Sequence, residues 1–340
     1  MLFHKDVVPI FFKKQQHPVV VCASRRTLLP GSGVYSGRLC FGDSLADTGN
    51  LLHSYPPGKH IPSGRWPYGE TFFHHPTGRF SDGRLIIDFI AQSLGLPFLE
   101  PFIGREKNEN TSSRDFRKGV NFAVAGATAL DVSFLEKYGI FNHLINVSLS
   151  TQLDWFKEYF ARQIQELIKL EARTVMSPGN LPIGCLPYYL SYYENSNEKE
   201  YDPKTGCLNW LNRFSEYHNE LLQKELNRLR GLYPHATIIY GDYYNAAMCL
   251  LSFSKQRFTS VVRACCGAGG PDNYNASTWS SYTPATNCDD PSKYVSWDGI
   301  HFTEAAYRWI AQGLLEGPYT NPHIRTVCTE ITRTYGLSEY

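Results

Sequence analysis

The chain has 340 residues, 42% of them hydrophobic and 14% aromatic, which is enough for one large domain with a substantial core. Its 33 basic and 32 acidic residues give a net charge of +1 without any block of like charge, so no nucleic-acid partner and no binding to anionic membranes by bulk electrostatics is expected. No apolar run is long enough for a membrane-spanning helix, and therefore no transmembrane segment is predicted.

The N-terminal segment carries two short apolar runs, at residues 7–12 and 19–23, with Lys13 and Lys14 between them. A good secretory signal has basic residues first and then one continuous apolar stretch, and this segment lacks that order. Residues 1–36 are accordingly assigned to a leader or poorly ordered N-terminal segment, and residues 331–340 to a tail. No linker divides the chain between them, which predicts a single domain over residues 37–330.

The domain alternates strand and helix patterns. Strands are predicted at residues 37–42, 119–125, 174–177 and 236–240, and helices at 84–94, 150–170, 208–232 and 304–315. One apolar face of the third helix is predicted to comprise Phe214, Tyr217, Leu221, Leu229 and Leu232. Stretches 53–80 and 178–207, rich in Pro, Gly and Tyr, are typical of loops. Such alternation indicates an α/β fold with a mostly parallel sheet covered by helices on both faces.

A serine follows the first predicted strand, within the segment CFGDSLADTGN at residues 40–50. Gly42 and Asp43 suit a tight turn, but a turn does not require Ser44. Because reactive groups collect at the carboxyl ends of strands in such sheets, Ser44 is a candidate nucleophile. Asp43 and Asp47 resemble a carboxylate pair for metal or glycoside chemistry, but hydrogen bonding within the turn is the favoured role for both.

The segment WDGIHFTEAAYR, at residues 297–308, places Asp298 three residues before His301 and directly ahead of a predicted helix. A carboxylate so close to a histidine can hold one ring nitrogen and leave the other for a serine, as a serine hydrolase requires. Taken alone, the segment fits a plain helix start better, with Asp298 and Thr303 as helix-start residues and His301 as a surface imidazole.

The nine cysteines form no CxxC pair, which favours disulfides in an oxidising compartment over a zinc site. Cys185 and Cys207 flank one loop and are predicted to be bonded, and Cys265 or Cys266 is predicted to pair with Cys288. Glycosylation sequons agree with a secreted glycoprotein; they lie at Asn110, Asn146 and Asn275. The adjacent His74 and His75 lack further ligands at recognisable spacing and are assigned to the surface.

Six blocks of the sequence occur in a telling order: FGDSLADTGN, GRFSDGRLIIDFIAQSLGLP, GVNFAVAGATALD, GNLPIGCLP, ACCGAGG and WDGIHFTEAAYR. From Leu39 to Cys328 the chain thereby resembles the plant GDSL-motif esterase/lipase family, a branch of the SGNH hydrolases. The resemblance implies a three-layer α/β/α, flavodoxin-like fold and hydrolysis of small-molecule acyl or lipid esters through an acyl-enzyme, with no cofactor and no metal. It leaves the oligomeric state unknown.

The resemblance also assigns roles to matching residues. It implies that Ser44 is the nucleophile, His301 the general base and Asp298 the residue that orients His301. The glycine of the NFAVAGA block, Gly126, would serve the oxyanion hole with its backbone amide, next to the amide of Ser44. A glycine at this place also suits close backbone packing beside a strand end.

One family block is missing. The pattern GxND, whose asparagine completes the family's oxyanion hole, occurs nowhere in the chain, although it belongs between STQLDWFK and GNLPIGC. A strand and its loop are therefore expected to be absent from the sheet. The fused stretch keeps a helical apolar face made of Leu153, Phe156, Phe160, Ile164, Leu167 and Ile168. Three functional hypotheses follow. The first is a secreted esterase with a weakened oxyanion hole. The second is a non-catalytic relative or misprocessed isoform that keeps the triad but cannot fold or turn over, and the third is a module that binds lipid or carbohydrate in the same cleft without chemistry.

Overall fold

The computed structural model describes residues 21–29, 32–56, 58–104, 119–139, 145–161, 174–194, 197–234, 236–253, 258–278 and 280–324. They form two compact units. The first comprises Met1–Pro57 and Leu99–Val175, and the second comprises Gly58–Phe98 and Met176–Tyr340. In the described part of the chain, no helix combines the length and the apolar character needed to cross a membrane.

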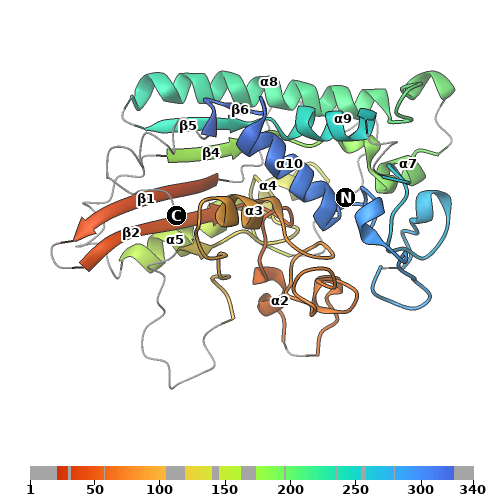
Figure 1. Ribbon diagram of the computed structural model, residues 1–340, viewed down its shortest axis with the longest axis horizontal. Helices are drawn as coiled ribbons and strands as arrows, with labels where there is room; N and C mark the ends of the chain where they lie inside the picture. Colours follow the sequence, from red (N-terminus) through yellow and green to blue (C-terminus); the bar gives the residue numbers. More distant parts are fainter. Residues whose placement is uncertain are drawn as a thin grey trace. The chain divides into compact units, whose positions relative to one another are not determined.

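The first unit is built on a hairpin. Its elements are β1 (Val21–Leu29), β2 (Ser32–Phe41), α2 (Asn50–Ser54), β3 (Val120–Asn121), α4 (Val132–Glu136) and α5 (Leu149–Ala161). Strand β2 pairs antiparallel with β1 (Figure 1). It also pairs parallel with β3, with Leu39 opposite Val120. The described part of the predicted N-terminal leader segment, residues 1–36, thus forms β1 and the beginning of β2.

Aromatic packing gives the first unit its core. The rings of Phe41, at the end of β2, and Phe122, just after β3, are stacked with their centroids 5.2 Å apart. Phe102 stacks on Trp155 of α5 at 5.9 Å. Since Phe41 is buried and Gly42 has a φ of 146°, the chain leaves the strand sharply at this point. The core therefore anchors the backbone immediately before Ser44.

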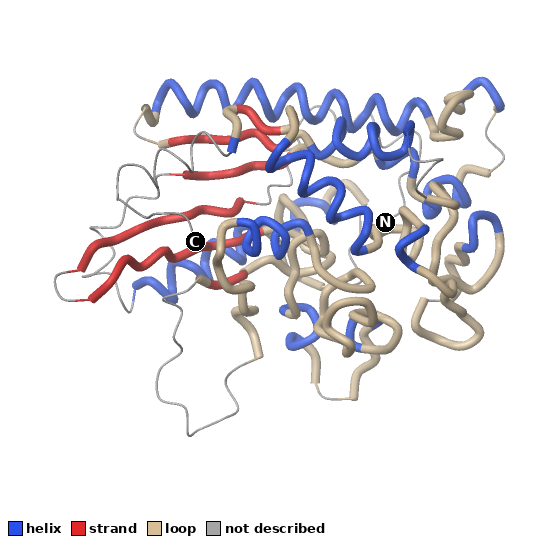
Figure 2. Tube along the Cα trace, in the orientation of Figure 1, coloured by secondary structure: helices blue, strands red, loops and turns tan. Residues whose placement is uncertain are grey.

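The second unit contains most of the helices. Its elements are α3 (Ile86–Ser93), most of β4 (Thr174–Pro178), α7 (Pro187–Tyr192), α8 (Asn209–Leu232), β5 (Thr237–Gly241), α9 (Tyr243–Phe253), α10 (Glu304–Glu316) and β6 (Thr320–Asn321). Strands β4, β5 and β6 follow one another in that order, and β6 is antiparallel to β5. Helix α8 runs along β5, as Figure 2 shows, and Leu222 and Leu226 pack on Ile238 and Tyr240.

Helix α8 begins within one residue of the predicted position and ends at the predicted one, but it buries a different face. Tyr217 and Leu232, predicted to be inward, are 41% and 57% exposed. The buried side includes polar residues, among them Asn212 and Asn219, whose side chains accept the backbone N–H groups of Gly184 and Asn180. The buried side of α8 thus combines these polar contacts with the apolar packing of Leu222 and Leu226, because buried backbone N–H groups need acceptors.

Most of the other predicted helices and strands are present at nearly the predicted positions. Helices α3 and α10 and strands β4 and β5 lie within two residues of their predicted bounds, and α9 and the short α7 were not predicted. Of the predicted helix 150–170, the part up to Ala161 is α5; residues 162–173 and the tail 331–340 lie outside the described residues. The α/β class agrees with these elements, and the three-layer arrangement stays a prediction.

Candidate active site

The Asp298–His301 pair is formed by one tight turn. Asp298 Oδ1 accepts the backbone N–H groups of Ile300 and His301, at 3.0 and 2.8 Å, and its Oδ2 accepts Nδ1 of the His301 ring at 2.8 Å. Gly299, at a φ of 93°, provides the left-handed residue that lets the chain reverse. The spacing of three residues therefore places the carboxylate on the imidazole, as the sequence predicts, and leaves Nε2 on the opposite side of the ring.

The electrostatics of the pair favour an ionised carboxylate. Asp298 and His301 are only 7% and 6% exposed. Burial raises the pKa of Asp298, but the nearby His301, the hydrogen bonds from its ring and backbone and a further one from Tyr68 outweigh burial and lower it to about 2. Asp298 is thus charged throughout the pH range in which an esterase would work, and it can stabilise a protonated His301.

Aromatic side chains enclose the pair. The hydroxyl of Tyr68 donates to Asp298 Oδ2 at 2.7 Å. The ring of Phe80 lies with its centroid 4.7 Å from that of His301, and Trp297 meets Tyr68 edge to face at 5.7 Å. Sequence reasoning missed Tyr68, because 230 residues separate it from Asp298 and no spacing signal connects them.

The start of α10 is held from several sides. Thr303 caps the helix by accepting the N–H of Ala306, as predicted. The N–H of Glu304 donates to Asp82 Oδ1 at 2.7 Å, and the carboxylate of Glu304 accepts the backbone N–H and the guanidinium of Arg84, each at 2.8 Å. Thr303 is therefore a helix-capping residue, as in a plain helix start. Asp298 is not, because its carboxylate binds the ring of His301.

Ser44 lies in the turn that follows β2. The carbonyl of Asp43 accepts the N–H groups of Ala46 and Asp47, at 3.1 and 3.0 Å, and its carboxylate accepts the N–H of Leu45 at 3.0 Å. Asp43 is therefore a turn residue, as predicted. Ser44 itself is half-buried. The turn begins at the sharp exit from β2, which agrees with the position expected for an exposed nucleophile.

A buried polar network connects this turn to the segment after β3. Asp47, fully buried, accepts the N–H groups of Gly49, Asn50, Leu51 and Ala125 at 2.6–3.0 Å. Burial raises the pKa of its carboxyl to about 6 although these four hydrogen bonds lower it. Asp47 thus acts within the backbone of the turn, which is the favoured of its two sequence interpretations.

Amide side chains complete the network. Asn50 donates to the carbonyls of Asn121 and Ala123, both at 2.8 Å, and Asn121 donates to the carbonyl of Ala46 at 2.5 Å. Gln152 of α5 binds both the N–H and the carbonyl of Gly42 at 2.8 Å. Sequence reasoning missed this network; for Asn121, an asparagine within the apolar run GVNFAVAG was the available signal.

Gly126 follows the same network. The N–H of its predecessor Ala125 donates to Asp47, and Gly126 has a φ of 81°, which suits a glycine. Ser44 and Gly126 thus belong to the first unit, whereas Asp298 and His301 belong to the second. The structure brings Asp298 and His301 together; the meeting of Ser44 with His301, and of Gly126 with the substrate, stays a prediction.

In the described residues, no group of three or more His, Cys, Asp or Glu side chains is placed to bind a metal ion. His74 and His75 are exposed, and their Nδ1 atoms lie 3.0 and 2.7 Å from the backbone carbonyls of Glu70 and Phe73. They are surface histidines bonded to their own loop.

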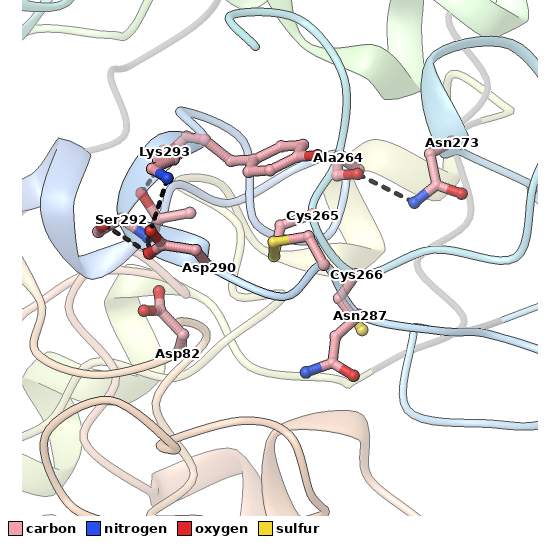
Figure 3. Close-up of a disulfide and its surroundings, with 12 residues drawn as sticks. Asp82, Ala264, Cys265, Cys266, Asn273, Asn287, Asp290, Ser292 and Lys293 are labelled. Atoms are coloured by element: carbon pink, nitrogen blue, oxygen red, sulfur yellow. Dashed lines mark hydrogen bonds and ion pairs between the residues drawn. A yellow bond between two sulfur atoms is a disulfide. The ribbon is translucent and has the colours of Figure 1, made fainter. Parts of the chain in front are cut away.

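Two disulfides confirm the cysteine predictions. Cys185 is bonded to Cys207, and of the two alternatives Cys265 is the partner of Cys288. Figure 3 shows Cys266 beside Cys265, and Asn273 donating to the carbonyl of Ala264. The thiol of Cys266 donates to the carbonyl of Ser280 at 2.9 Å. Burial, followed by the charges of Asp298 and Glu70, raises the pKa of this thiol, so it stays protonated.

A family model and several curated relatives are similar to this chain. The family model "GDSL-like Lipase/Acylhydrolase" matches residues 39–160 and 150–314. The chain is 47% identical to a GDSL esterase/lipase of Arabidopsis thaliana over 346 positions, covering 85% of this chain and 88% of the relative. It is 46% identical to another over 349 positions, covering 86% and 87%. It is 39% identical to the sinapine esterase of Brassica napus over 383 positions, covering 96% of each chain.

The alignments with these relatives contain gaps in this chain. The first runs over 346 positions, whereas 85% of the 340 residues of this chain is only about 289 residues, so that about 57 positions of the relative face gaps here. The two stretches that the family model matches meet at residues 150–160, which is where the sequence predicts the loss of the GxND block.

Together, the matched stretches span most of the chain, and the relatives are similar over nearly their whole length. They include the turn that carries Ser44 and the Asp298–His301 pair. The chain therefore belongs to the GDSL-like lipase/acylhydrolase family.

Proposed function

We propose that this protein hydrolyses carboxylic esters, of acyl or lipid type, through a Ser44–His301–Asp298 triad and an acyl-enzyme. The observation that carries the proposal is the buried Asp298–His301 pair, with Nδ1 held at 2.8 Å by an ionised carboxylate. Such a pair has little structural reason to be buried next to aromatic rings, but it suits a base that must gain and lose a proton. Family membership supports the same reaction.

In the proposed first step, Ser44 Oγ attacks the ester carbonyl carbon and its proton passes to Nε2 of His301. Asp298 stabilises the imidazolium and keeps the ring oriented. The tetrahedral intermediate then collapses, His301 returns the proton to the leaving alcohol, and the acyl group remains on Ser44. Water attacks the acyl-enzyme with His301 again as base, which releases the acid and restores Ser44.

The oxyanion of each tetrahedral intermediate would be held by the backbone N–H groups of Ser44 and Gly126. The family resemblance implies that an asparagine side chain of a GxND block adds a further donor, and the sequence of this chain contains no GxND pattern. The loss of one such donor lowers turnover by about 10²–10³. We therefore propose a slow esterase with a weakened oxyanion hole.

A second proposal has the same origin. Since about 57 positions of the relatives face gaps here, the chain is alternatively an impaired isoform, or a relative that uses the same surface to bind lipid or carbohydrate without chemistry. The intact Ser44, Asp298 and His301 favour the esterase. A binding protein would bind the same esters without turnover and without reaction at Ser44.

We also propose a secreted protein. Two disulfides are typical of an oxidising compartment. Of the three sequons, Asn146 and Asn275 are exposed and therefore accessible to glycosylation, whereas Asn110 lies outside the described residues. Peptide mapping of secreted material before and after deglycosylation would test both sites.

Reaction with a serine-directed fluorophosphonate probe tests the triad. The probe is expected to label the protein, and Ser44→Ala is expected to abolish both labelling and the hydrolysis of p-nitrophenyl butyrate. Ser191→Ala, which changes a half-buried serine on α7 whose hydroxyl donates to the carbonyl of Pro271, serves as the control and keeps both. Labelling that persists in folded Ser44→Ala would assign the chemistry to another residue. Sinapine, in view of the named Brassica relative, is a second ester for the same assay.

Restoring the missing segment tests the weakened oxyanion hole. A chimaera that receives this segment from the Arabidopsis relative is expected to hydrolyse p-nitrophenyl butyrate about 10²–10³ times faster. A chimaera whose block reads Ala in place of the GxND asparagine is the control, and it should gain far less. Equal turnover before and after grafting, with all proteins folded, contradicts the weakened-hole account.

A further inference from the structure

Tyr68 has an unusual position for a loop residue. It is 1% exposed, and its ring meets Trp297 edge to face at 5.7 Å and Phe80 at 6.0 Å. These contacts fix the plane of the ring and aim the hydroxyl at Asp298 Oδ2, 2.7 Å away. Phe80 in turn lies against His301. Tyr68 is thus packed against both residues that flank the carboxylate and the imidazole.

The hydroxyl of Tyr68 and the ring of His301 bind the same carboxylate oxygen of Asp298. Asp298 Oδ1 is occupied by the N–H groups of Ile300 and His301, whereas Oδ2 accepts Nδ1 of His301 and the Tyr68 hydroxyl. Two donors at one carboxylate oxygen compete for its electron density. The strength of the Asp298–His301 hydrogen bond therefore depends on Tyr68.

We propose that Tyr68 is a positioning residue that holds Asp298 Oδ2 in line with His301 and limits how strongly the carboxylate stabilises the protonated imidazole. The proposal rests on the proposed function of His301 as general base. A base works best when it accepts a proton readily in the first step and returns it readily to the leaving group. A carboxylate that also accepts the hydrogen bond of Tyr68 holds the protonated imidazole less strongly, so His301 returns the proton to the leaving group more readily.

Other titratable groups near Asp298 do not replace Tyr68. Burial, followed by nearby charges that include Asp298, raises the pKa of the Cys266 thiol and of the Tyr274 hydroxyl, so both are neutral at ordinary pH. Cys266 donates instead to the carbonyl of Ser280. Tyr68 also stays protonated, because burial and the adjacent Asp298 raise its pKa. It is therefore a permanent hydrogen-bond donor.

Tyr68→Phe tests the proposal because it removes only the hydroxyl and keeps the ring between Trp297 and Phe80. Without the competing donor, Asp298 stabilises protonated His301 more strongly. The acid limb of kcat/KM for p-nitrophenyl butyrate is then expected to move to higher pH by about half a unit to one unit. The downfield proton resonance of the His301 Nδ1–H is expected to move further downfield, because its acceptor is stronger.

Tyr244→Phe is the matched control. The Tyr244 hydroxyl also donates to a carboxylate at 2.7 Å, Glu216 Oε1, on helices that lack the catalytic pair. This variant should alter stability in the same way as Tyr68→Phe and leave both the acid limb and the resonance unchanged. If both signals also stay unchanged in folded Tyr68→Phe, Tyr68 is merely structural and the proposal is wrong.

Replacement of Tyr68 by 3-fluorotyrosine adds a test with the opposite sign and keeps the hydroxyl. Its more acidic phenol withdraws more charge from Oδ2, so the acid limb is expected at lower pH and the resonance at higher field. The resonance is independent of turnover, whereas loss of labelling in Ser44→Ala tests the triad itself. A fault in the proposed function and a fault in the role of Tyr68 therefore give different results.

Discussion

Asp298 illustrates how much chemistry one residue carries. Its two oxygens accept four donors, and the outcome is a pKa of about 2 despite burial. The two backbone donors are the N–H groups of Ile300 and His301, two and three residues after Asp298. The local chain alone can therefore orient the carboxylate. Only the fourth donor, Tyr68, comes from far away in the sequence.

Asp298→Asn is expected to lower kcat by roughly 10⁴ with little change in KM. The amide cannot stabilise an imidazolium, and its NH₂ group either confronts the Nδ1–H of His301 or forces the other tautomer. Hydrolysis of p-nitrophenyl butyrate measures the effect. Asp290→Asn is the control, because Asp290 is an exposed cap with its oxygens on Ser292 and Lys293. A turnover that survives in folded Asp298→Asn would remove Asp298 from the mechanism.

Asp47→Asn is expected to destabilise the protein by about 3 kcal/mol or more. Each carboxylate oxygen accepts two buried backbone N–H groups, and an NH₂ in place of one oxygen leaves two of these donors unsatisfied at about 1–3 kcal/mol each. The midpoint of urea unfolding measures the change. Asp202→Asn is the control, because one oxygen of Asp202 accepts all its hydrogen bonds from Lys204 and Thr205, and the amide keeps that oxygen. Its expected destabilisation is less than about 0.5 kcal/mol. Equal effects of both variants would contradict this account.

At the scale of elements, α10 depends on the loop before α3. Asp82 and Arg84 hold Glu304 at the first turn of α10, directly after the residues that carry His301. Arg79 adds a buried ion pair with Asp88 inside α3 at 2.8 Å. Since one partner left alone would be a buried unpaired charge, these pairs specify how the helices meet more than they add to stability.

The disulfide between Cys185 and Cys207 closes the segment that contains α7. The two cysteines are 22 residues apart, and their double replacement by Ala is expected to lower the free energy of unfolding by about 3 kcal/mol in the chain-entropy model. Urea unfolding under non-reducing conditions measures it. Cys249→Ala changes a half-buried thiol that forms no disulfide among the described residues, and it should have a clearly smaller effect. A double variant as stable as Cys249→Ala would show that the bridge adds no stability.

At the scale of the whole molecule, three buried carboxyls determine a pH dependence. Burial raises the pKa of Asp47 and Asp82 to about 6, so both bind a proton more tightly in the folded state. Their contribution to stability is complete below pH 4 and is lost as the pH rises through 6. The pKa of Asp298 is lowered to about 2, and its contribution is lost as the pH falls from about 4 towards 2.

The melting temperature is therefore expected to be highest near pH 4 and to fall on both sides. A pKa change from 3.8 to about 6 corresponds to at most roughly 3 kcal/mol per carboxyl. Thermal unfolding between pH 2 and pH 8 measures the profile. Asp82→Asn should flatten the decline between pH 4 and pH 6, and Asp202→Asn should leave it unchanged. A profile that rises steadily from pH 4 to pH 7 would contradict the assignment.

Local patterns determined much of this protein. The three-residue spacing of Asp298 and His301 is enough to form their hydrogen bond, because a single turn connects them. The bounds of α10 and the cap at Thr303 follow from short-range rules of the same kind. The bond between Cys185 and Cys207 was predictable because both lie at the ends of one loop. In each case the interacting groups are near neighbours, so the chain itself keeps them within reach.

Only the tertiary structure decided the contacts between distant segments. Tyr68 meets Asp298 across 230 residues, and Glu304 meets Arg84 across 220. The buried face of α8 combines Leu222 and Leu226, which pack on β5, with Asn212 and Asn219, whose side chains accept backbone N–H groups of a segment far away in the sequence. Periodicity records that a residue is buried, but the partner that satisfies a buried polar group is chosen by packing over the whole unit. The sequence alone therefore predicted the Asp298–His301 pair, and the tertiary structure added the tyrosine that controls it.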